Sequence, residues 1–181
     1  MEFQHILKVL VTRFDDKKIP YALIGAVALG LLGVLRATGD IDFLVRKEDM
    51  PVISAIMKDL GYSVINDTEN VTQFSHDLRA FGTIDFLHAF RKPTLVMLER
   101  AEEKSVFSGE IRIKVVLPED LIGLKLQAIK NNPELKAMSM QDIVNLVEIH
   151  GESMDWKEIE TYAKILRMED AYSEIRSFLK S

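Results

Sequence analysis

Apolar residues recur along this chain with two different periods, one typical of helices and one typical of strands. From Phe3 to Phe14 they return every three or four positions, as on one face of an amphipathic helix. Short apolar runs between glycine, proline or polar turns predict strands. The expected helices span residues 3–16, 26–34, 48–60, 92–104, 118–130, 141–150, 156–166 and 169–179. The expected strands span residues 21–24, 40–45, 62–65, 71–78, 81–89 and 111–116.

The order of these elements changes near Pro118. Helices and strands alternate before it and only helices are expected after it, and Pro118 with Glu119 and Asp120 is typical of a helix start. We therefore expect an α+β fold, with a mixed-sheet α/β core flanked by helices over residues 1–117 and a helical subdomain packed on it over residues 118–181. The connections are too short for an independent linker, so we expect one compact body with a cleft between its halves.

Composition narrows the classes of protein that these elements can form. The chain has 181 residues, 48% of them hydrophobic, which is ample for a core, and its net charge of −5 argues against a broadly basic nucleic-acid-binding surface. The absence of cysteine excludes disulfides, zinc–thiolate sites and thiol nucleophiles. The N-terminus lacks the features of a signal peptide, and no apolar run is long enough to span a membrane. We therefore expect a cytoplasmic protein with no membrane partner.

The first candidate chemistry is a pair of aspartates, Asp40 and Asp42, at the start of an expected strand. Side chains two positions apart point to the same face of a strand, so the two carboxylates would lie side by side among apolar neighbours. Burying two such charges without a partner is costly, and a divalent cation removes that cost. Mg²⁺ is typically held by one or two carboxylates together with substrate phosphates. On spacing alone, the pair could also be ordinary turn or cap residues.

Two other positions fit the same chemistry. Gly25 ends the preceding strand just before a helix, where its missing side chain lets the backbone approach a ligand closely and the first N–H groups of the helix favour a phosphate. Asp85 lies within an apolar strand, where a carboxylate needs a partner. Together with Asp40 and Asp42, these residues predict a site for phosphates and metal ions.

The residues just described resemble the nucleotidyltransferase superfamily related to DNA polymerase beta. The family pattern is a hydrophobic residue, Gly, then Gly or Ser, a spacer, and Asp-hydrophobic-Asp-hydrophobic. The chain carries Ile24-Gly25-Ala26, a spacer ending in GVLRATGD, and Asp40-Ile41-Asp42-Phe43. The Arg-Ala-Thr-x-Asp-Ile-Asp run is typical of a small prokaryotic branch that includes nucleotidyltransferase-type toxins of toxin–antitoxin systems. The segments GTIDFLH, LPEDLIGLKLQAI and QDIVNL resemble its third-carboxylate and C-terminal helical motifs.

This resemblance implies transfer of a nucleoside monophosphate from an NTP to an acceptor hydroxyl, with release of pyrophosphate. The acceptor would be an RNA end such as that of tRNA, a protein side chain or a small molecule, and an antitoxin-like protein would be a further partner. The implied cofactor is Mg²⁺, with Mn²⁺ as an alternative. The implied catalytic and metal-binding residues are Asp40, Asp42 and Asp85; the implied nucleotide-binding residues are Gly25, Ala26, Arg36, Lys125 and Asp142.

The sequence departs from the family pattern at two places. Ala26 stands where the family has Gly or Ser, which keeps a backbone N–H but removes a hydroxyl contact to phosphate, and Ser139 stands where close relatives have the first of two acidic residues. Arg36 and Asp142 could equally be plain surface residues. Two other functions stay open: a non-catalytic nucleotide- or partner-binding module of a toxin–antitoxin-like system, and a metal-dependent phosphohydrolase or nuclease.

Overall fold

The computed structural model describes residues 3–180, so the outermost positions of the two expected domains, residues 1, 2 and 181, lie outside it. The helices are α1 (Phe3–Lys17), α2 (Gly25–Leu31), α3 (Met50–Asp59), α4 (Lys92–Glu99), α5 (Pro118–Asn131), α6 (Lys136–His150), α7 (Trp156–Leu166) and α8 (Glu169–Ser177). The strands are β1 (Tyr21–Ile24), β2 (Asp40–Arg46), β3 (Tyr62–Asp67), β4 (Val71–His76), β5 (Thr83–Ala89), β6 (Glu102–Val106) and β7 (Ile111–Val115).

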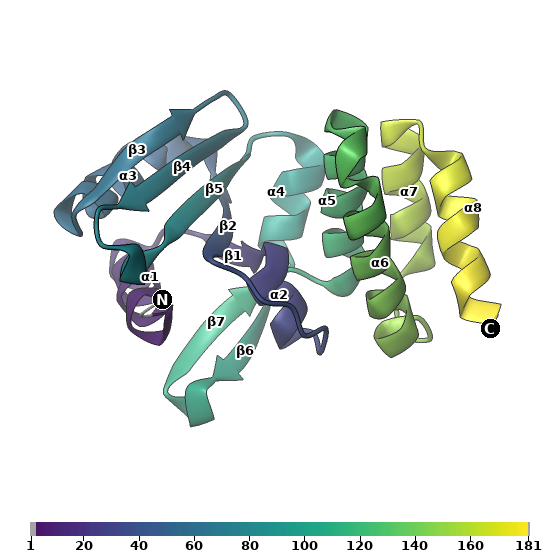
Figure 1. Cartoon of the computed structure of the whole chain (residues 1–181), viewed down its shortest axis with the longest axis horizontal. Coiled ribbons are helices and arrows are strands. Elements are labelled where there is room, and N and C mark those ends of the chain that lie inside the picture. The colour runs from purple at the N-terminus through teal and green to yellow at the C-terminus, as the bar shows by residue number, and fades with distance from the viewer. Residues whose placement is uncertain (1–2, 181) are drawn as a thin grey trace. The chain divides into compact units, whose positions relative to one another are not determined.

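The strands form one mixed sheet in the order β3-β4-β5-β2-β1-β7-β6 (Figure 1). Strands β2 and β5 run parallel, as do β1 and β7, and the other neighbouring pairs are antiparallel. The mixed sheet flanked by helices, followed by a helical part, confirms the α+β fold expected from the sequence.

The chain divides into two compact units. The first comprises residues 1–28 and 36–116 and contains the whole sheet; the second comprises residues 29–35 and 117–181. Helix α2 contributes to both units, because its first residues belong to the first and its last residues to the second.

An aromatic cluster forms the core of the first unit on one face of the sheet. The ring of Phe14 from α1 lies 5.5 Å from Phe43 and 5.5 Å from Tyr21, and the Phe43 ring stacks on Phe86 at 5.7 Å. Alternation along a strand sends the neighbours of Phe43 and Phe86 to the opposite face. Those neighbours include Asp42 and Asp85, so the apolar core anchors the two strands while leaving their other face for the carboxylates.

Four helices make up most of the second unit, and they lie side by side in Figure 1. Buried apolar residues of α5 and α6 pack between them, among them Ile122, Leu126 and Leu146. The Tyr162 hydroxyl of α7 donates a hydrogen bond to Asp120 of α5 at 2.6 Å, which satisfies a fully buried carboxylate. Gly123 lies directly under the Tyr162 ring, where a Cβ atom would overlap it. This close approach fixes α7 against α5.

One expected helix extends too far. Residues 92–104 were expected to be helical, but α4 ends at Glu99 and residues 102–106 form β6. Strand β6 is an edge strand with largely exposed side chains, so its sequence lacks the apolar alternation that reveals a strand. Its antiparallel pairing with β7, across a short turn, makes it one. The expected strand at residues 62–65 is, in contrast, too short, because β3 continues to Asp67. Within residues 3–180, no helix has both the length and the apolar character needed to cross a bilayer.

Candidate active site

Strand pairing brings the three predicted catalytic carboxylates to neighbouring positions of the first unit. Strands β2 and β5 are parallel, with Asp42 opposite Asp85 and Asp40 opposite Thr83. Residues paired in this way point to the same face of a sheet, and so do residues two apart on one strand. Asp40, Asp42 and Asp85 therefore occupy one face at the beginning of two adjacent strands.

Neighbouring hydroxyl and amide groups hold two of these carboxylates. The Thr83 hydroxyl donates to Asp40 Oδ1, and the Gln73 side-chain amide donates to Asp85 Oδ2 at 2.7 Å. The hydroxyl of Thr38 accepts from the Asp40 N–H at 3.1 Å, which ties the preceding loop to the start of β2. By contrast, Asp85 Oδ1 is buried and has no hydrogen-bond partner. A buried acceptor without a partner costs about 1–3 kcal/mol, so this oxygen marks a position where a ligand would be stabilising.

The environment of Asp85 disfavours its charged form. Burial raises the pKa of this carboxyl above its usual value, and the Asp40 carboxylate adds to the rise, whereas the hydrogen bond from Gln73 opposes it. Each cause follows from general rules: low dielectric and a like charge both destabilise a carboxylate, and a donated hydrogen bond stabilises it. A cation beside Asp85 would remove the first two penalties.

This raised pKa predicts that Asp85→Asn stabilises the metal-free protein at neutral pH. Because the pKa of Asp85 is higher in the folded protein than in the unfolded chain, ionised Asp85 lowers the free energy of unfolding at neutral pH. This destabilisation disappears as the pH falls through the folded-state pKa. The variant should therefore unfold with a higher free energy at pH 7.5 in EDTA. The difference should shrink at pH 5, as measured by urea titration.

When Mg²⁺ replaces EDTA in this urea titration, it should stabilise the unmodified protein more than the variant. An Asp85→Asn variant that is less stable than the unmodified protein at both pH values would contradict the electrostatic reading of this position.

Gly25 touches the carboxylate site directly. It has a positive φ of 66°, and a Cβ atom at this position would overlap the side chain of Asp42. Both observations require glycine, because L-residues with a side chain rarely adopt this backbone conformation and no space exists for one. Helix α2 begins at Gly25, and Ala26 follows in its first turn. The predicted Gly25 therefore lies next to the carboxylates, as its place in the motif implies.

The remaining predicted nucleotide-binding residues lie elsewhere. Arg36 is half-buried in the irregular segment between α2 and β2 and belongs to the first unit. Lys125 of α5 and Asp142 of α6 belong to the second unit, where Lys125 Nζ lies 2.5 Å from Asp142 Oδ2. Their side chains are only 13% and 7% exposed. The two buried charges neutralise each other, so their presence does not require a bound ligand. A nucleotide-binding role for these two residues stays a prediction.

The buried pair predicts a large asymmetry between single and double variants. Lys125→Met should cost about 3–5 kcal/mol of unfolding free energy, because it leaves a buried carboxylate without its cation. Adding Asp142→Leu should recover much of that loss, since two apolar residues often replace a buried ion pair at little cost. Urea unfolding of the three proteins checks this, and additive losses would contradict it. The exposed pair Lys164–Glu160, 2.5 Å apart on α7, supplies the control, where Lys164→Met should change the unfolding free energy far less than Lys125→Met does.

The carboxylates of Asp40, Asp42 and Asp85 are candidate ligands of a metal ion. Among residues 3–180, no three His, Cys, Asp or Glu side chains form a ready-made coordination group. Mg²⁺, however, needs only one or two carboxylates when substrate phosphates supply other ligands. Asp85 offers a buried oxygen without a partner, and Asp40 and Asp42 lie on the same face of β2, beside β5. The donor set is therefore suited to Mg²⁺ or Mn²⁺ bound together with a triphosphate.

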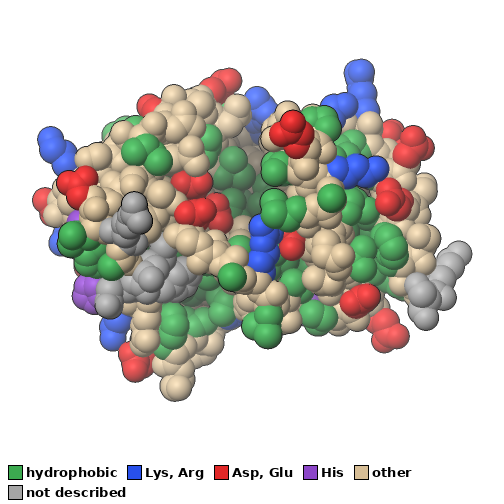
Figure 2. Space-filling model, in the orientation of Figure 1, with side chains coloured by type: hydrophobic (Ala, Val, Ile, Leu, Met, Phe, Trp, Pro, Cys, Tyr) green, Lys and Arg blue, Asp and Glu red, His purple; other side chains and the backbone are tan. Residues whose placement is uncertain are grey.

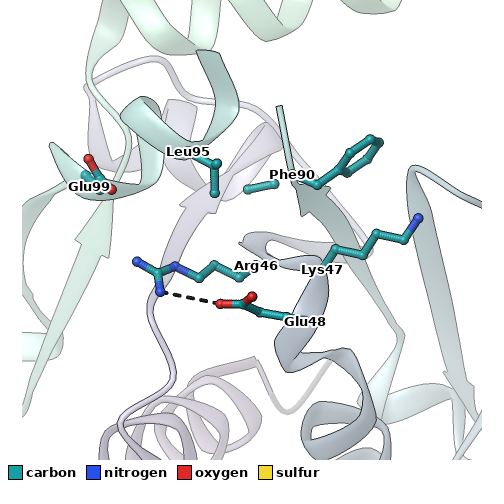
Figure 3. A pocket seen from close by; sticks show the side chains of 7 residues that line it. Arg46, Lys47, Glu48, Phe90, Leu95 and Glu99 are labelled. Atoms are coloured by element: carbon teal, nitrogen blue, oxygen red, sulfur yellow. Dashed lines mark ion pairs between the residues drawn. The ribbon is translucent and has the colours of Figure 1, made fainter. Parts of the chain in front are cut away.

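A separate pocket of about 570 Å³ lies in the first unit, at the opposite ends of the same strands (Figure 3). It is lined by Arg46, Lys47, Glu48, Ala89, Phe90, Leu95 and Glu99. Arg46 is six residues along β2 from Asp40, or about 20 Å at the usual rise of a strand. Figure 3 shows the Lys47 and Phe90 side chains extending together. The Lys47 nitrogen lies 4.8 Å from the centre of the Phe90 ring. Two cations and two carboxylates balance in this lining, so the pocket lacks the acidic character of the first site.

Three contributors to the site escaped the sequence reasoning: Thr83, Gln73 and Asn66. Thr83 and Gln73 bond directly to Asp40 and Asp85, and the side-chain amide of Asn66 donates to Gln73 at 3.0 Å. Alternation along the strand does place Thr83 on the face of Asp85, but its bond to Asp40 depends on the pairing of β2 with β5. Pairing of Gln73 with Asp85, however, depends on the register between β4 and β5, which a single sequence does not specify.

Charge is mixed over the surface around these features. On the face drawn in Figure 2, Lys and Arg side chains are interspersed with Asp and Glu. This agrees with a modest net charge of −5 and with the absence of a basic composition.

The fold is shared with several solved structures. The antibiotic-resistance factor ANT(2'')-Ia matches with a TM-score of 0.65 and 15% identity over 98% of each chain. The lincosamide antibiotic adenylyltransferase LnuA matches with a TM-score of 0.53 and 16% identity over 82% of this chain and 96% of its own. An antigenic nucleotidyltransferase-like protein from Paracoccidioides brasiliensis matches with a TM-score of 0.57 and 16% identity, over 97% of this chain and 91% of its own. At these identities the likeness shows a common fold.

The sequence itself gives the family. No curated protein matches the chain significantly. A family model described as "Uncharacterised nucleotidyltransferase" matches it over residues 1–181, which confirms the resemblance drawn from Gly25, Asp40 and Asp42. The narrower likeness to toxin–antitoxin enzymes stays a prediction. This chain belongs to that nucleotidyltransferase family.

Proposed function

We propose that this protein is a Mg²⁺-dependent nucleotidyltransferase that moves a nucleoside monophosphate from an NTP to an acceptor hydroxyl. One observation carries the proposal: parallel pairing of β2 and β5 sets Asp42 beside Asp85, with Asp40 on the same face and a buried Asp85 oxygen left without a partner. Family membership supports the reaction type.

The residues present suit each part of this reaction. Asp40, Asp42 and Asp85 would hold Mg²⁺, which supplies charge neutralisation for the triphosphate. Gly25 removes any side chain from the approach to Asp42, so phosphate groups can lie close to the backbone there. No residue needs to form a covalent intermediate, because phosphoryl-type transfer depends on positioning and electrostatics.

The bonds that change are few. The acceptor hydroxyl oxygen forms a bond to the α-phosphorus, and the bond from that phosphorus to the bridging oxygen of pyrophosphate breaks. The hydroxyl proton passes to solvent water, and Asp40, Asp42 and Asp85 would hold the cation whose charge favours its loss.

The acceptor class that we favour is a small molecule bearing a hydroxyl group. Support comes from solved relatives of the same fold: ANT(2'')-Ia has been captured with adenylyl-2''-tobramycin, and LnuA is an antibiotic adenylyltransferase that has been captured with lincomycin. The net charge of −5 also favours a small acceptor over a long nucleic acid. An RNA end, a protein side chain and partnership with an antitoxin-like protein are the alternatives that the test separates.

The test uses each of the four α-labelled NTPs with Mg²⁺ and fractionated cell extract. We expect label in the small-molecule fraction with at least one NTP, loss of labelling in EDTA, and release of one pyrophosphate per label transferred. A variant with both Asp40 and Asp42 changed to Asn controls for contaminating enzymes. Label in the RNA or protein fraction would show that the acceptor is RNA or protein and not a small molecule. Release of phosphate to water without labelled product would indicate a hydrolase, and binding of NTP without turnover would indicate a binding module.

A further inference from the structure

A row of polar side chains crosses the sheet and ends at the candidate active site. Strand register places Asn66 of β3 opposite Gln73 of β4, Gln73 opposite Asp85 of β5, and Asp85 opposite Asp42 of β2. Residues directly opposite one another in neighbouring strands share a face of the sheet. The row therefore connects an edge of the sheet to two of the carboxylates through consecutive strands.

An irregularity in β3 brings Asn66 into this row. Val64 pairs with Phe74, and the next paired residue is Asn66, opposite Gln73, so Ile65 has no opposite residue. Without this bulge, Ile65 would face Gln73 and the row would end in an apolar side chain. Ile65 is instead 59% exposed. Bulges often re-aim a side chain next to a functional site, and here the bulge substitutes an amide for an isoleucine.

The hydrogen bonds along the row have a defined direction. Asn66 Nδ2 donates to Gln73 Oε1 at 3.0 Å, so the Gln73 carbonyl oxygen is already engaged. Gln73 Nε2 then donates to Asp85 Oδ2 at 2.7 Å. An amide carries its donor and acceptor on different atoms, so the bond from Asn66 selects the orientation in which Gln73 presents N–H groups to the carboxylate. One oxygen of Asp85 is thereby occupied, and only Oδ1 stays without a partner.

We propose that Asn66 and Gln73 are positioning residues that make Asp85 a one-oxygen ligand, with Oδ2 held by the protein and Oδ1 left for the metal ion. The inference rests on the proposed function. A structural role alone does not account for the arrangement, because packing would not favour a buried oxygen with an unmet hydrogen-bonding requirement. Partners behind a metal ligand fix its orientation, and losing one typically lowers metal affinity or activity 10–100-fold, about the effect expected here.

The test measures Mn²⁺ binding by electron paramagnetic resonance and Mg²⁺ dependence of transfer in the full chain. Gln73→Leu removes the donor to Asp85, and Asn66→Ala removes only the bond that orients Gln73. Gln141→Leu is the matched control, because Gln141 makes a similar amide bond to Asn145 at 3.0 Å on α6. Thermal unfolding of every variant shows whether it folds.

We expect Gln73→Leu to weaken Mn²⁺ binding about 10–100-fold and Asn66→Ala to weaken it by a smaller factor, with no change for Gln141→Leu. The Mg²⁺ concentration for half-maximal transfer should rise in parallel, while saturating Mg²⁺ restores most of the rate of Gln73→Leu. If Gln73 had only a structural role, its substitution would lower the unfolding temperature, and saturating Mg²⁺ would not restore the transfer rate.

The outcomes separate the two proposals. If the unmodified protein binds Mn²⁺ and transfers nucleotide, but both variants are folded and bind Mn²⁺ with unchanged affinity, the positioning role is overturned and the proposed function stands. If the unmodified protein neither binds Mn²⁺ at millimolar concentration nor transfers nucleotide, both proposals are overturned. If Gln73→Leu does not fold, the Mn²⁺ affinity of Asn66→Ala tests the positioning role instead, and an unchanged affinity overturns it.

Discussion

We expect the change of Asp42 to Asn to abolish nucleotide transfer and to leave the fold intact. Asp42 is the central member of the site, because it pairs with Ile24 on one side and with Asp85 on the other, and it faces Gly25. Asparagine has the same shape but lacks the negative charge that a divalent cation requires. The rate should fall by more than about 100-fold, which is the upper range for losing a residue that only supports a metal ligand.

The measurement is single-turnover labelling from an α-labelled NTP at saturating Mg²⁺, with circular dichroism and thermal unfolding as checks of the fold. Asp59→Asn is the matched control, because Asp59 lies at the end of α3 with its side chain 72% exposed and 3.9 Å from Arg13. That variant should label normally. Full labelling by Asp42→Asn would refute the mechanism.

Changing Gly25 to Ala should damage both stability and activity. The residue has a φ of 66°, and adopting a left-handed backbone costs an L-residue about 1–2 kcal/mol. The added Cβ would also overlap the Asp42 side chain, so that carboxylate must move. We expect a loss of more than about 1–2 kcal/mol in unfolding free energy, and a fall in transfer rate larger than the stability loss explains at temperatures where the variant is fully folded.

Gly30 supplies the control on the same helix. A Cβ at Gly30 would meet no atom within 4 Å, and the residue is exposed in α2. Gly30→Ala should therefore stabilise the protein by up to about 1 kcal/mol, because alanine loses less backbone freedom than glycine when a helix forms. Equal effects of the two substitutions in urea unfolding would show that helix propensity, and not the contact with Asp42, governs this segment.

The buried pair of Lys125 and Asp142 changes how the sequence motif in the second unit is interpreted. The resemblance implies that both residues contact nucleotide, yet each already has a buried partner of opposite charge in the other. A cationic side chain that neutralises a buried carboxylate is needed for stability whether or not it also meets a ligand. Ser139, which replaces an acidic residue of close relatives, is buried one turn before Asp142. An acid there would put a second carboxylate beside this single lysine.

The sequence by itself determined the family and the elements that carry the chemistry. Strand β1 and the start of β2 at Asp40 follow from local apolar runs and turn residues, and both depend only on neighbours along the chain. The choice of Gly25, Asp40 and Asp42 also needed no tertiary information, because the motif is continuous in sequence. Strand β6 was missed because its side chains are mostly exposed and only its pairing with β7 makes it a strand.

Only the tertiary structure decided which distant residues meet. The parallel pairing of β2 with β5 sets Asp85 beside Asp42, and the bulge at Ile65 brings Asn66 to Gln73. Strand register is set by how whole strands align, and a shift of one residue would turn every side chain to the other face. The sequence could therefore identify the three carboxylates but not the partners around them. The hydrogen bonds that hold Asp85, and its single oxygen without a partner, became visible only in the folded chain.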